Sequence, residues 1–131
     1  MKTSEALPLL ENARNAAKHS HSPYSKFRVG AALLCADGQV ITGCNVENAS
    51  YGLTLCAERN AITTAIAAGI RSFKALAVVA EGTLPYPCGA CRQVLAEFCE
   101  PAFPVLIADA RALDAFEQHR LDELLPKAFG R

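Results

Sequence analysis

The sequence predicts an α/β fold in which a single mixed sheet carries helices on both of its faces. Three observations support this class: two β-type runs joined by Asp37-Gly38, later apolar runs of strand length, and segments of helical periodicity between them. The chain has 131 residues, of which 51% are hydrophobic, so one domain spanning residues 1–131 can bury a sizeable core.

The N-terminal part predicts a helix followed by a hairpin. Apolar residues recur at helical spacing from residue 4 to about residue 18, and Pro8 is expected to perturb the first turn of this helix. Residues 28–36 and 39–46 are β-type runs, and Asp37-Gly38 between them favours a tight two-residue turn because it tolerates positive φ. We therefore expect a β-hairpin over residues 28–46.

The middle of the chain alternates between loops, helices and a buried strand. A polar stretch over residues 45–55 should be a loop that leads into a helix from about residue 56 to residue 68, which Gly69 ends. Residues 73–80 form an apolar run, apart from Lys74, which is the pattern of a strand covered on both faces. A Pro-rich loop at residues 84–87 then precedes a helix from about residue 88 to residue 99.

The C-terminal part is less regular. Residues 104–108 predict another buried strand. The stretch from residue 110 to residue 125 is ambiguous, because its composition favours a helix whereas only residues 121–125 have a strongly helical pattern. The order helix, hairpin, helix, strand, helix, strand gives one mixed sheet with helices on both faces.

Charge and hydropathy exclude several classes of partner. Thirteen Lys and Arg balance thirteen Asp and Glu, so no net field attracts nucleic acid or an anionic membrane surface. The sequence shows no export signal and no apolar run of the ~18 residues that a membrane span needs. We expect a cytoplasmic protein with reduced thiols that acts on a small, roughly neutral ligand.

Three of the six cysteines are spaced as metal ligands. Cys56 and the Cys88/Cys91 pair fall at the starts of two predicted helices, where the macrodipole and free N–H groups stabilise the thiolate that binds zinc. Three thiolates leave one open position on a tetrahedral Zn²⁺, as in catalytic sites, where zinc lowers the pKa of bound water. The sequence therefore predicts a catalytic zinc site.

Charged residues beside these cysteines suit the same chemistry. Glu58 stands two residues after Cys56, where it can reach the water without binding the metal and can shuttle protons. Arg59 follows Glu58 and Arg92 follows Cys91, so either or both can hydrogen-bond the sulfurs and draw off negative charge.

Other interpretations of the cysteines stay open on the residues alone. Cys88 and Cys91 also fit a redox pair, although no thioredoxin-like context surrounds them. A structural zinc site, as in a non-catalytic zinc-stabilised binding module, requires a fourth ligand, for which the candidates are Cys35, Cys44, His19 and His21.

Longer motifs resemble a known family. Cys56-Ala57-Glu58-Arg59 and Pro87-Cys88-Gly89-Ala90-Cys91-Arg92-Gln93 resemble the zinc signature of nucleoside and nucleobase deaminases. Three further segments resemble the small homotetrameric cytidine deaminases: residues 23–33, residues 43–51, and Leu124-Leu125-Pro126 with Phe129. The resemblance covers essentially the whole chain.

This resemblance implies a fold and a reaction. The fold is a three-layer α/β/α sandwich around a mixed five-stranded sheet, whose last strand would lie in residues 110–120. The reaction is the hydrolysis of cytidine and 2′-deoxycytidine to the uridines and ammonia, as in pyrimidine salvage. One Zn²⁺ per subunit would be held by Cys56, Cys88 and Cys91, with Glu58 as the catalytic acid and base.

The resemblance also implies substrate contacts and assembly. Phe27 would pack against the base, Ala57 would offer backbone groups to it, and Asn45 and Glu47 would hydrogen-bond the ribose 3′-hydroxyl. Tyr51 would lie in the loop near the ribose. Phe129 would close the pocket of a neighbouring subunit in a homotetramer.

The Glu47 carboxylate would repel a phosphate, which favours free nucleosides over nucleotides or nucleic acid. An aminonucleoside-antibiotic deaminase of the blasticidin type remains the alternative, for which the loop from Asn45 to Asn48 is less suited.

Overall fold

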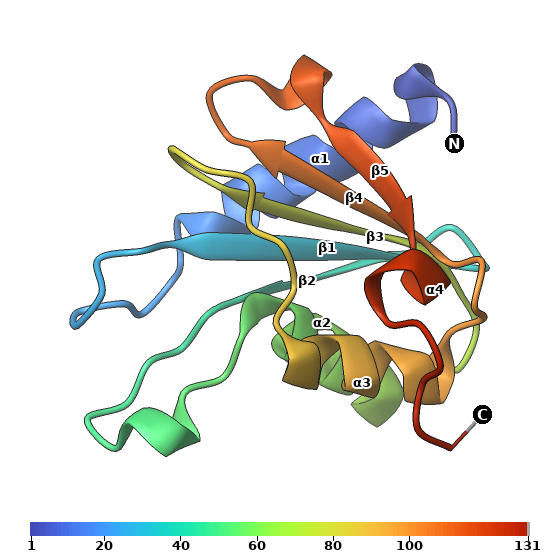
Figure 1. The fold of residues 1–131 in the computed structure, drawn as a ribbon. Coiled ribbons are helices and arrows are strands. Elements are labelled where there is room, and N and C mark those ends of the chain that lie inside the picture. Colours follow the sequence, from blue (N-terminus) through green and yellow to red (C-terminus); the bar gives the residue numbers. More distant parts are fainter. Residues whose placement is uncertain (131) are drawn as a thin grey trace.

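Five strands form one mixed sheet in the computed structural model, which describes residues 1–130 (Figure 1). The strands are β1 (Val29–Cys35), β2 (Val40–Cys44), β3 (Phe73–Ala80), β4 (Pro104–Asp109) and β5 (Glu117–Arg120). Their order across the sheet is β2-β1-β3-β4-β5. Strands β3 and β4 are parallel, and the other neighbours are antiparallel, which confirms the predicted mixed sheet.

Helices cover both faces of this sheet (Figure 1). Helix α1 (Thr3–Ala17) lies on one face, and α2 (Ala57–Ala67) and α3 (Gly89–Phe98) lie side by side on the other, with the short α4 (Leu121–Leu124) next to α3. Two 3₁₀ turns, η1 (Tyr51–Leu53) and η2 (Leu113–Ala115), interrupt the loops. The predicted three-layer α/β/α sandwich is confirmed. None of the helices within residues 1–130 is long and apolar enough to span a membrane.

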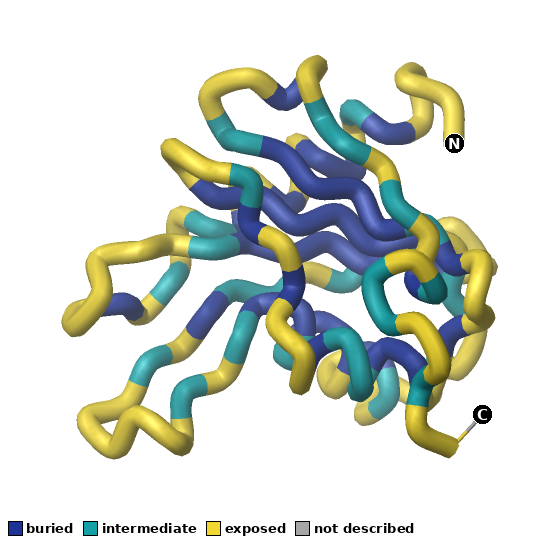
Figure 2. Tube along the Cα trace, viewed as in Figure 1, coloured by how far each residue is buried: buried dark blue, intermediate teal, exposed yellow. Residues whose placement is uncertain are grey.

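The central strands are mostly apolar because they are buried from both sides. In β3, Leu76 and Val78 pack in the core under α2 and α3, whereas Ala77 and Val79 pack in the core under α1. Figure 2 shows that most of each inner strand is buried. Burial on both sides explains why residues 75–80 of β3 are all apolar in the sequence.

Two glycines let helices approach the sheet closely. A Cβ added to Gly43 in β2 would lie 2.5 Å from the backbone nitrogen of Ala61 and 2.6 Å from the carbonyl oxygen of Ala57, both in α2. A Cβ added to Gly30 in β1 would lie 1.9 Å from the carbonyl oxygen of Ala13 in α1. Since real Cβ contacts are longer, only glycine allows these helix positions.

The hairpin forms where predicted, but its turn is longer. The backbone nitrogen of Cys35 donates to the carbonyl oxygen of Gln39 at 2.9 Å, and that of Gly38 donates to the carbonyl oxygen of Cys35 at 3.0 Å. Residues 36–39 therefore lie between β1 and β2, the Cys35–Gln39 bond encloses a three-residue loop, 36–38, and Gly38 has a positive φ of 93°. The predicted two-residue turn is wrong, because a three-residue loop with glycine in the left-handed position also matches the strand twist.

One further expectation about local structure is wrong. Residues 110–120 form η2 and the edge strand β5 in place of the helix that composition favoured, because β4 offers an unpaired edge that Glu117 and His119 join opposite Ile107 and Val105. The strand expected from the family resemblance is thereby confirmed. Pro8 lies inside α1, which continues to Ala17.

Candidate active site

Two helix N-termini bring the three predicted zinc ligands together. Cys56 and Cys88 are the N-cap residues of α2 and α3, and Cys91 lies in the first turn of α3. The Sγ atoms of Cys88 and Cys91 are 3.4 Å apart, those of Cys56 and Cys88 are 4.0 Å apart, and all three lie within 4.8 Å of one another. Zn–S bonds of ~2.3 Å in tetrahedral geometry require S–S separations of roughly 3.8 Å, so the cluster fits zinc.

No fourth ligand from the described residues joins this cluster. Within residues 1–130, no other His, Cys, Asp or Glu has a ligand atom in the group, so none of the candidate ligands Cys35, Cys44, His19 and His21 belongs to it. This geometry argues against a closed structural zinc site. The third thiol beside Cys88 and Cys91 also favours metal binding over a two-cysteine redox pair.

The metal-free thiols already differ in acidity. A hydrogen bond from the Cys91 thiol, followed by the nearby Arg59, lowers the pKa of Cys56 to about 5. The same bond to Cys56, with burial, raises the pKa of Cys91 above its usual range. Cys56 is thus the ligand that is ready to bind as a thiolate at neutral pH.

Glu58 is a buried carboxyl in the first turn of α2. Only 5% of the residue is exposed, and this burial raises the pKa of its carboxyl to about 7. A carboxyl that titrates near neutral pH can both accept and donate a proton there. Glu58 is not a member of the ligand cluster, as its predicted role requires.

The two arginines have different partners. Arg59 donates from Nη2 to the Cys56 sulfur at 3.3 Å and to the carbonyl oxygen of Thr54 at 3.4 Å. Arg92 donates from Nε to the carbonyl oxygen of Pro87 at 2.7 Å and from Nη1 to that of Leu124 at 2.6 Å. Arg59 therefore contacts a sulfur, whereas Arg92 ties the segment before Cys88 to the end of α4.

A cavity of about 210 Å³ opens beside the cluster. Residues predicted for the site line it from four segments of the chain: Phe27, Asn45, Cys56, Ala57, Glu58 and Cys88. Four further lining residues, Val29, Thr54, Pro85 and Tyr86, were not predicted. Thr54, Pro85 and Tyr86 each stand two or three residues before a zinc ligand, a proximity that sequence analysis could have used.

Asn45 and Glu47 hold the loops around the cavity. The Asn45 side chain donates to the carbonyl oxygen of Phe27 at 2.8 Å and accepts from the backbone nitrogen of Val29 at 3.0 Å. The Glu47 carboxylate accepts from the backbone nitrogens of Tyr24 and Ser25 at 3.0 and 3.1 Å, and also from the Ser25 hydroxyl. That hydroxyl bond is the main cause that lowers the pKa of Glu47, so its carboxylate stays ionised.

Three predicted substrate contacts lie outside or at the edge of this cavity. Glu47 and Tyr51 line an adjoining hollow, which shares Thr54 with the cavity. The Tyr51 ring packs edge-on against Tyr24, with centroids 5.9 Å apart. Phe129 is 88% exposed and is not among the residues that line the cavity.

This fold and site define a zinc-dependent deaminase: a buried carboxyl beside three thiols at the starts of two neighbouring helices. A family model for the "Cytidine and deoxycytidylate deaminase zinc-binding region" matches residues 3–107. The chain belongs to this family.

Individual relatives support the same family assignment. The cytidine deaminase of Sporosarcina psychrophila is 48% identical over 124 residues, which are 94% of this chain and 90% of that protein. The crystal structure of cytidine deaminase from Burkholderia pseudomallei has a TM-score of 0.90 at 45% identity and covers 98% of this chain and 100% of its own. Blasticidin-S deaminase of Bacillus cereus is more distant, at 25% identity over 119 residues, 82% of this chain and 80% of that protein.

Proposed function

We propose that this chain hydrolyses cytidine and 2′-deoxycytidine to uridine and 2′-deoxyuridine with release of ammonia, as in pyrimidine salvage. One observation carries the proposal. The buried Glu58 carboxyl lines the same cavity as Cys56 and Cys88, beside a thiol cluster that no other protein ligand within residues 1–130 closes.

The reaction requires one proton carrier. Zinc, when bound by Cys56, Cys88 and Cys91, supplies a Lewis acid that makes water nucleophilic near neutral pH. Glu58 removes a proton from the water and gives it to N3 of the pyrimidine while the water oxygen bonds to C4. Glu58 then takes the second proton of the water and transfers it to the 4-amino group, the C4–N bond breaks, and ammonia leaves.

The substrate contacts follow the cavity walls. Phe27 packs against the pyrimidine and the backbone of Ala57 hydrogen-bonds it, since both residues line the cavity. Asn45 and Glu47 hydrogen-bond the ribose, with Tyr51 beside them in the adjoining hollow. An ionised Glu47 accepts from a sugar hydroxyl and repels a phosphate, so free nucleosides are preferred over nucleotides and nucleic acid.

Assembly and location complete the proposal. The exposed Phe129 is available to close the pocket of a second copy of this chain, in a homotetramer with one Zn²⁺ per subunit. Size-exclusion chromatography with light scattering tests the tetramer, and Phe129→Ala is expected to raise KM without loss of zinc. A cytoplasmic location, where nucleosides are salvaged, remains a prediction.

Substitution of Glu58 by Gln tests the function. We expect zinc to be retained while kcat for cytidine falls by about 10²–10⁴, the effect of removing a positioned acid-base group. Glu97→Gln is the matched control, because Glu97 is an exposed carboxylate on α3. Unchanged deamination in the Glu58 variant, followed by ultraviolet absorbance, would rule out the proposed role. Parallel assays with blasticidin S, cytosine and cytidine 5′-monophosphate test the substrate class.

A further inference from the structure

We propose that Tyr86 is a positioning residue: Glu117 and His119 of β5 hold its side chain and thereby fix the loop that forms one wall of the cavity. The consequence for substrate affinity rests on the function proposed above. We call the contact of Tyr86 with Glu117 and His119 the anchor, and its existence does not depend on that function.

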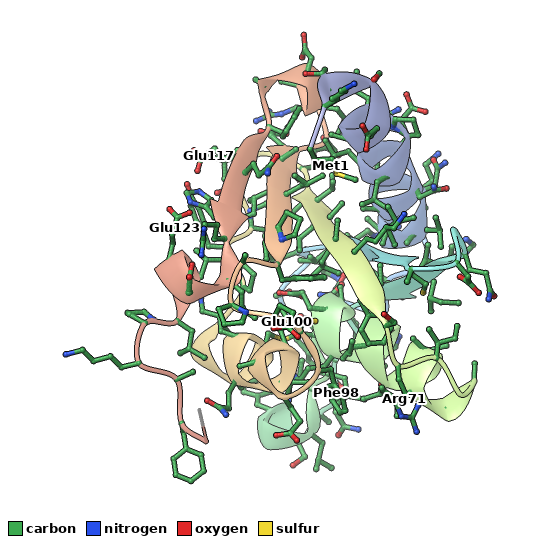
Figure 3. All side chains as sticks on the ribbon, turned by 90° about the vertical axis from the view of Figure 1, so that its right-hand side faces the viewer. Met1, Arg71, Phe98, Glu100, Glu117 and Glu123 are labelled. Atoms are coloured by element: carbon green, nitrogen blue, oxygen red, sulfur yellow. The ribbon has the colours of Figure 1, made fainter. Side chains whose placement is uncertain are left out.

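Two groups, from Tyr86 and His119, meet at the Glu117 carboxylate. The Tyr86 hydroxyl donates to Glu117 Oε1 at 2.6 Å, and His119 Nε2 lies 2.9 Å from the same oxygen. The Tyr86 and His119 rings also pack edge-on, with centroids 6.0 Å apart. Glu117 projects from β5 at the edge of the sheet (Figure 3). Tyr86 is thus held both by a hydrogen bond and by a ring contact.

The backbone of this loop makes few hydrogen bonds, although the side chains of Pro85 and Pro87 are buried. Pro85 and Pro87 have no backbone N–H, so the nitrogen of Tyr86 is the single backbone donor of residues 85–87, and it bonds within the loop to Leu84. The connection from β3 to α3, which contains this loop, crosses from the sheet to the helical layer (Figure 1). Side-chain contacts therefore fix the loop: Pro85 and Pro87 are buried, and Tyr86 supplies a contact to β5.

The strand presents both anchor residues on the same side. Glu117 and His119 alternate with Gln118 along β5, and successive side chains of a strand point to opposite faces. Gln118 is exposed, whereas Glu117 and His119 are partly buried. Glu117 and His119 therefore lie on the face of β5 that contacts the loop, and Gln118 lies on the opposite face.

The charges strengthen this contact. The Tyr86 bond, with His119 second, lowers the pKa of Glu117. The acceptor is therefore ionised at neutral pH, and a hydrogen bond to an ionised acceptor is stronger than one between neutral groups.

The position of the loop affects both the cavity and the metal site. Pro85 and Tyr86 line the cavity directly, and one residue after Tyr86 the chain continues through Pro87 to Cys88. A loop released from β5 would change the cavity wall and loosen one zinc ligand. Arg92, which holds the carbonyl of Pro87 from the α3 side, would remain as the second attachment.

Four variants test the anchor: Tyr86→Phe, Glu117→Ala, Glu117→Gln and Gln118→Ala. We expect Tyr86→Phe and Glu117→Ala to raise KM for cytidine by about three- to tenfold, as for one lost hydrogen bond, with kcat changed less than about twofold. Transfer of zinc to an added chelator should become faster by a similar factor. Glu117→Gln keeps an acceptor oxygen and should restore most of the wild-type behaviour, and Gln118→Ala, on the other face of β5, should match wild type.

A purely structural tether would lower Tm in Tyr86→Phe and Glu117→Ala while leaving KM and the rate of zinc transfer unchanged, and this result would overturn the proposal. Equal effects of Gln and Ala at position 117 would overturn it as well. If the wild-type protein does not turn over cytidine, the proposed function fails, and zinc transfer in the same variants still decides whether the anchor exists.

Discussion

The guanidinium of Arg59 lies 3.3 Å from the Cys56 sulfur, although Arg59 belongs to the body of α2 and Cys56 only caps it. The bond places a permanent positive charge on a cluster that carries three negative charges once zinc is bound. It therefore reduces the electron density that the sulfurs donate to the metal.

Removal of this charge should slow the reaction without emptying the site. We expect Arg59→Ala to lower kcat by about 10–100-fold, the usual effect of losing a group that hydrogen-bonds a metal ligand. Arg59→Lys keeps the positive charge but lacks the planar guanidinium, so its kcat should lie between those of the wild type and Arg59→Ala. Steady-state kinetics with zinc determination by atomic absorption checks this, and wild-type kcat in the Ala variant would contradict it.

Zinc loading should release protons in a pH-dependent manner. At pH 7, Cys56, with a pKa of about 5, is already ionised, whereas Cys91, with its raised pKa, holds a proton that zinc must displace. Below about pH 5, Cys56 is protonated as well, so one more proton is released and the apparent zinc affinity falls. Titration calorimetry of the metal-free protein in buffers of different ionisation enthalpy measures the number of protons released per zinc bound. Release of the same number at pH 4.5 and pH 7 would disprove the low pKa of Cys56.

Substitutions at Gly43 and Gly30, where helices approach the sheet closely, should distinguish effects on stability from effects on catalysis. Gly43→Ala and Gly30→Ala each push a helix away from the sheet, and we expect each to lower the free energy of unfolding by about 1–3 kcal/mol. Only Gly43→Ala displaces α2, which carries Glu58, so it alone should also lower kcat at temperatures where both variants are folded. Urea unfolding and kinetics test this, and an equal loss of kcat in the two variants would refute the distinction.

Arg92 should matter mainly for stability. Arg92→Ala leaves the carbonyls of Pro87 and Leu124 without this donor, which we expect to cost about 1–3 kcal/mol of unfolding free energy. Arg71→Ala is the control, because Arg71 also donates to backbone carbonyls but is exposed, and its loss should cost less than about 1 kcal/mol. Similar unfolding curves for the two variants would show that Arg92 does not fasten the loop.

Local signals in the sequence predicted much of the fold. The apolar run of β3 was predicted at residues 73–80, the residues it occupies. Gly69 ends the α2 segment with a φ of 87°, as a C-terminal glycine should. The zinc ligands were found because helix N-termini and the Cys88/Cys91 spacing are local features, and two helix starts after strand-loop connections converge in such a fold.

Contacts between distant residues were the part that the sequence did not reveal. The polar residues of β5 pair because β4 leaves an edge open, which overrides their preference for a helix. Arg92 stands beside a zinc ligand in the sequence, yet its donors reach Leu124, 32 positions away. Tyr86 and Glu117 are likewise 31 positions apart in the sequence, so no local periodicity or motif predicts their contact.

The short separation between Cys88 and Cys91 also governs how the protein must be handled. Their sulfurs are 3.4 Å apart and Cys88 is exposed, so once the ion is stripped, an oxidant can join them in a disulfide that blocks reloading. Metal-free preparations therefore need a thiol reductant, and air oxidation after chelation should inactivate the protein until it is reduced again.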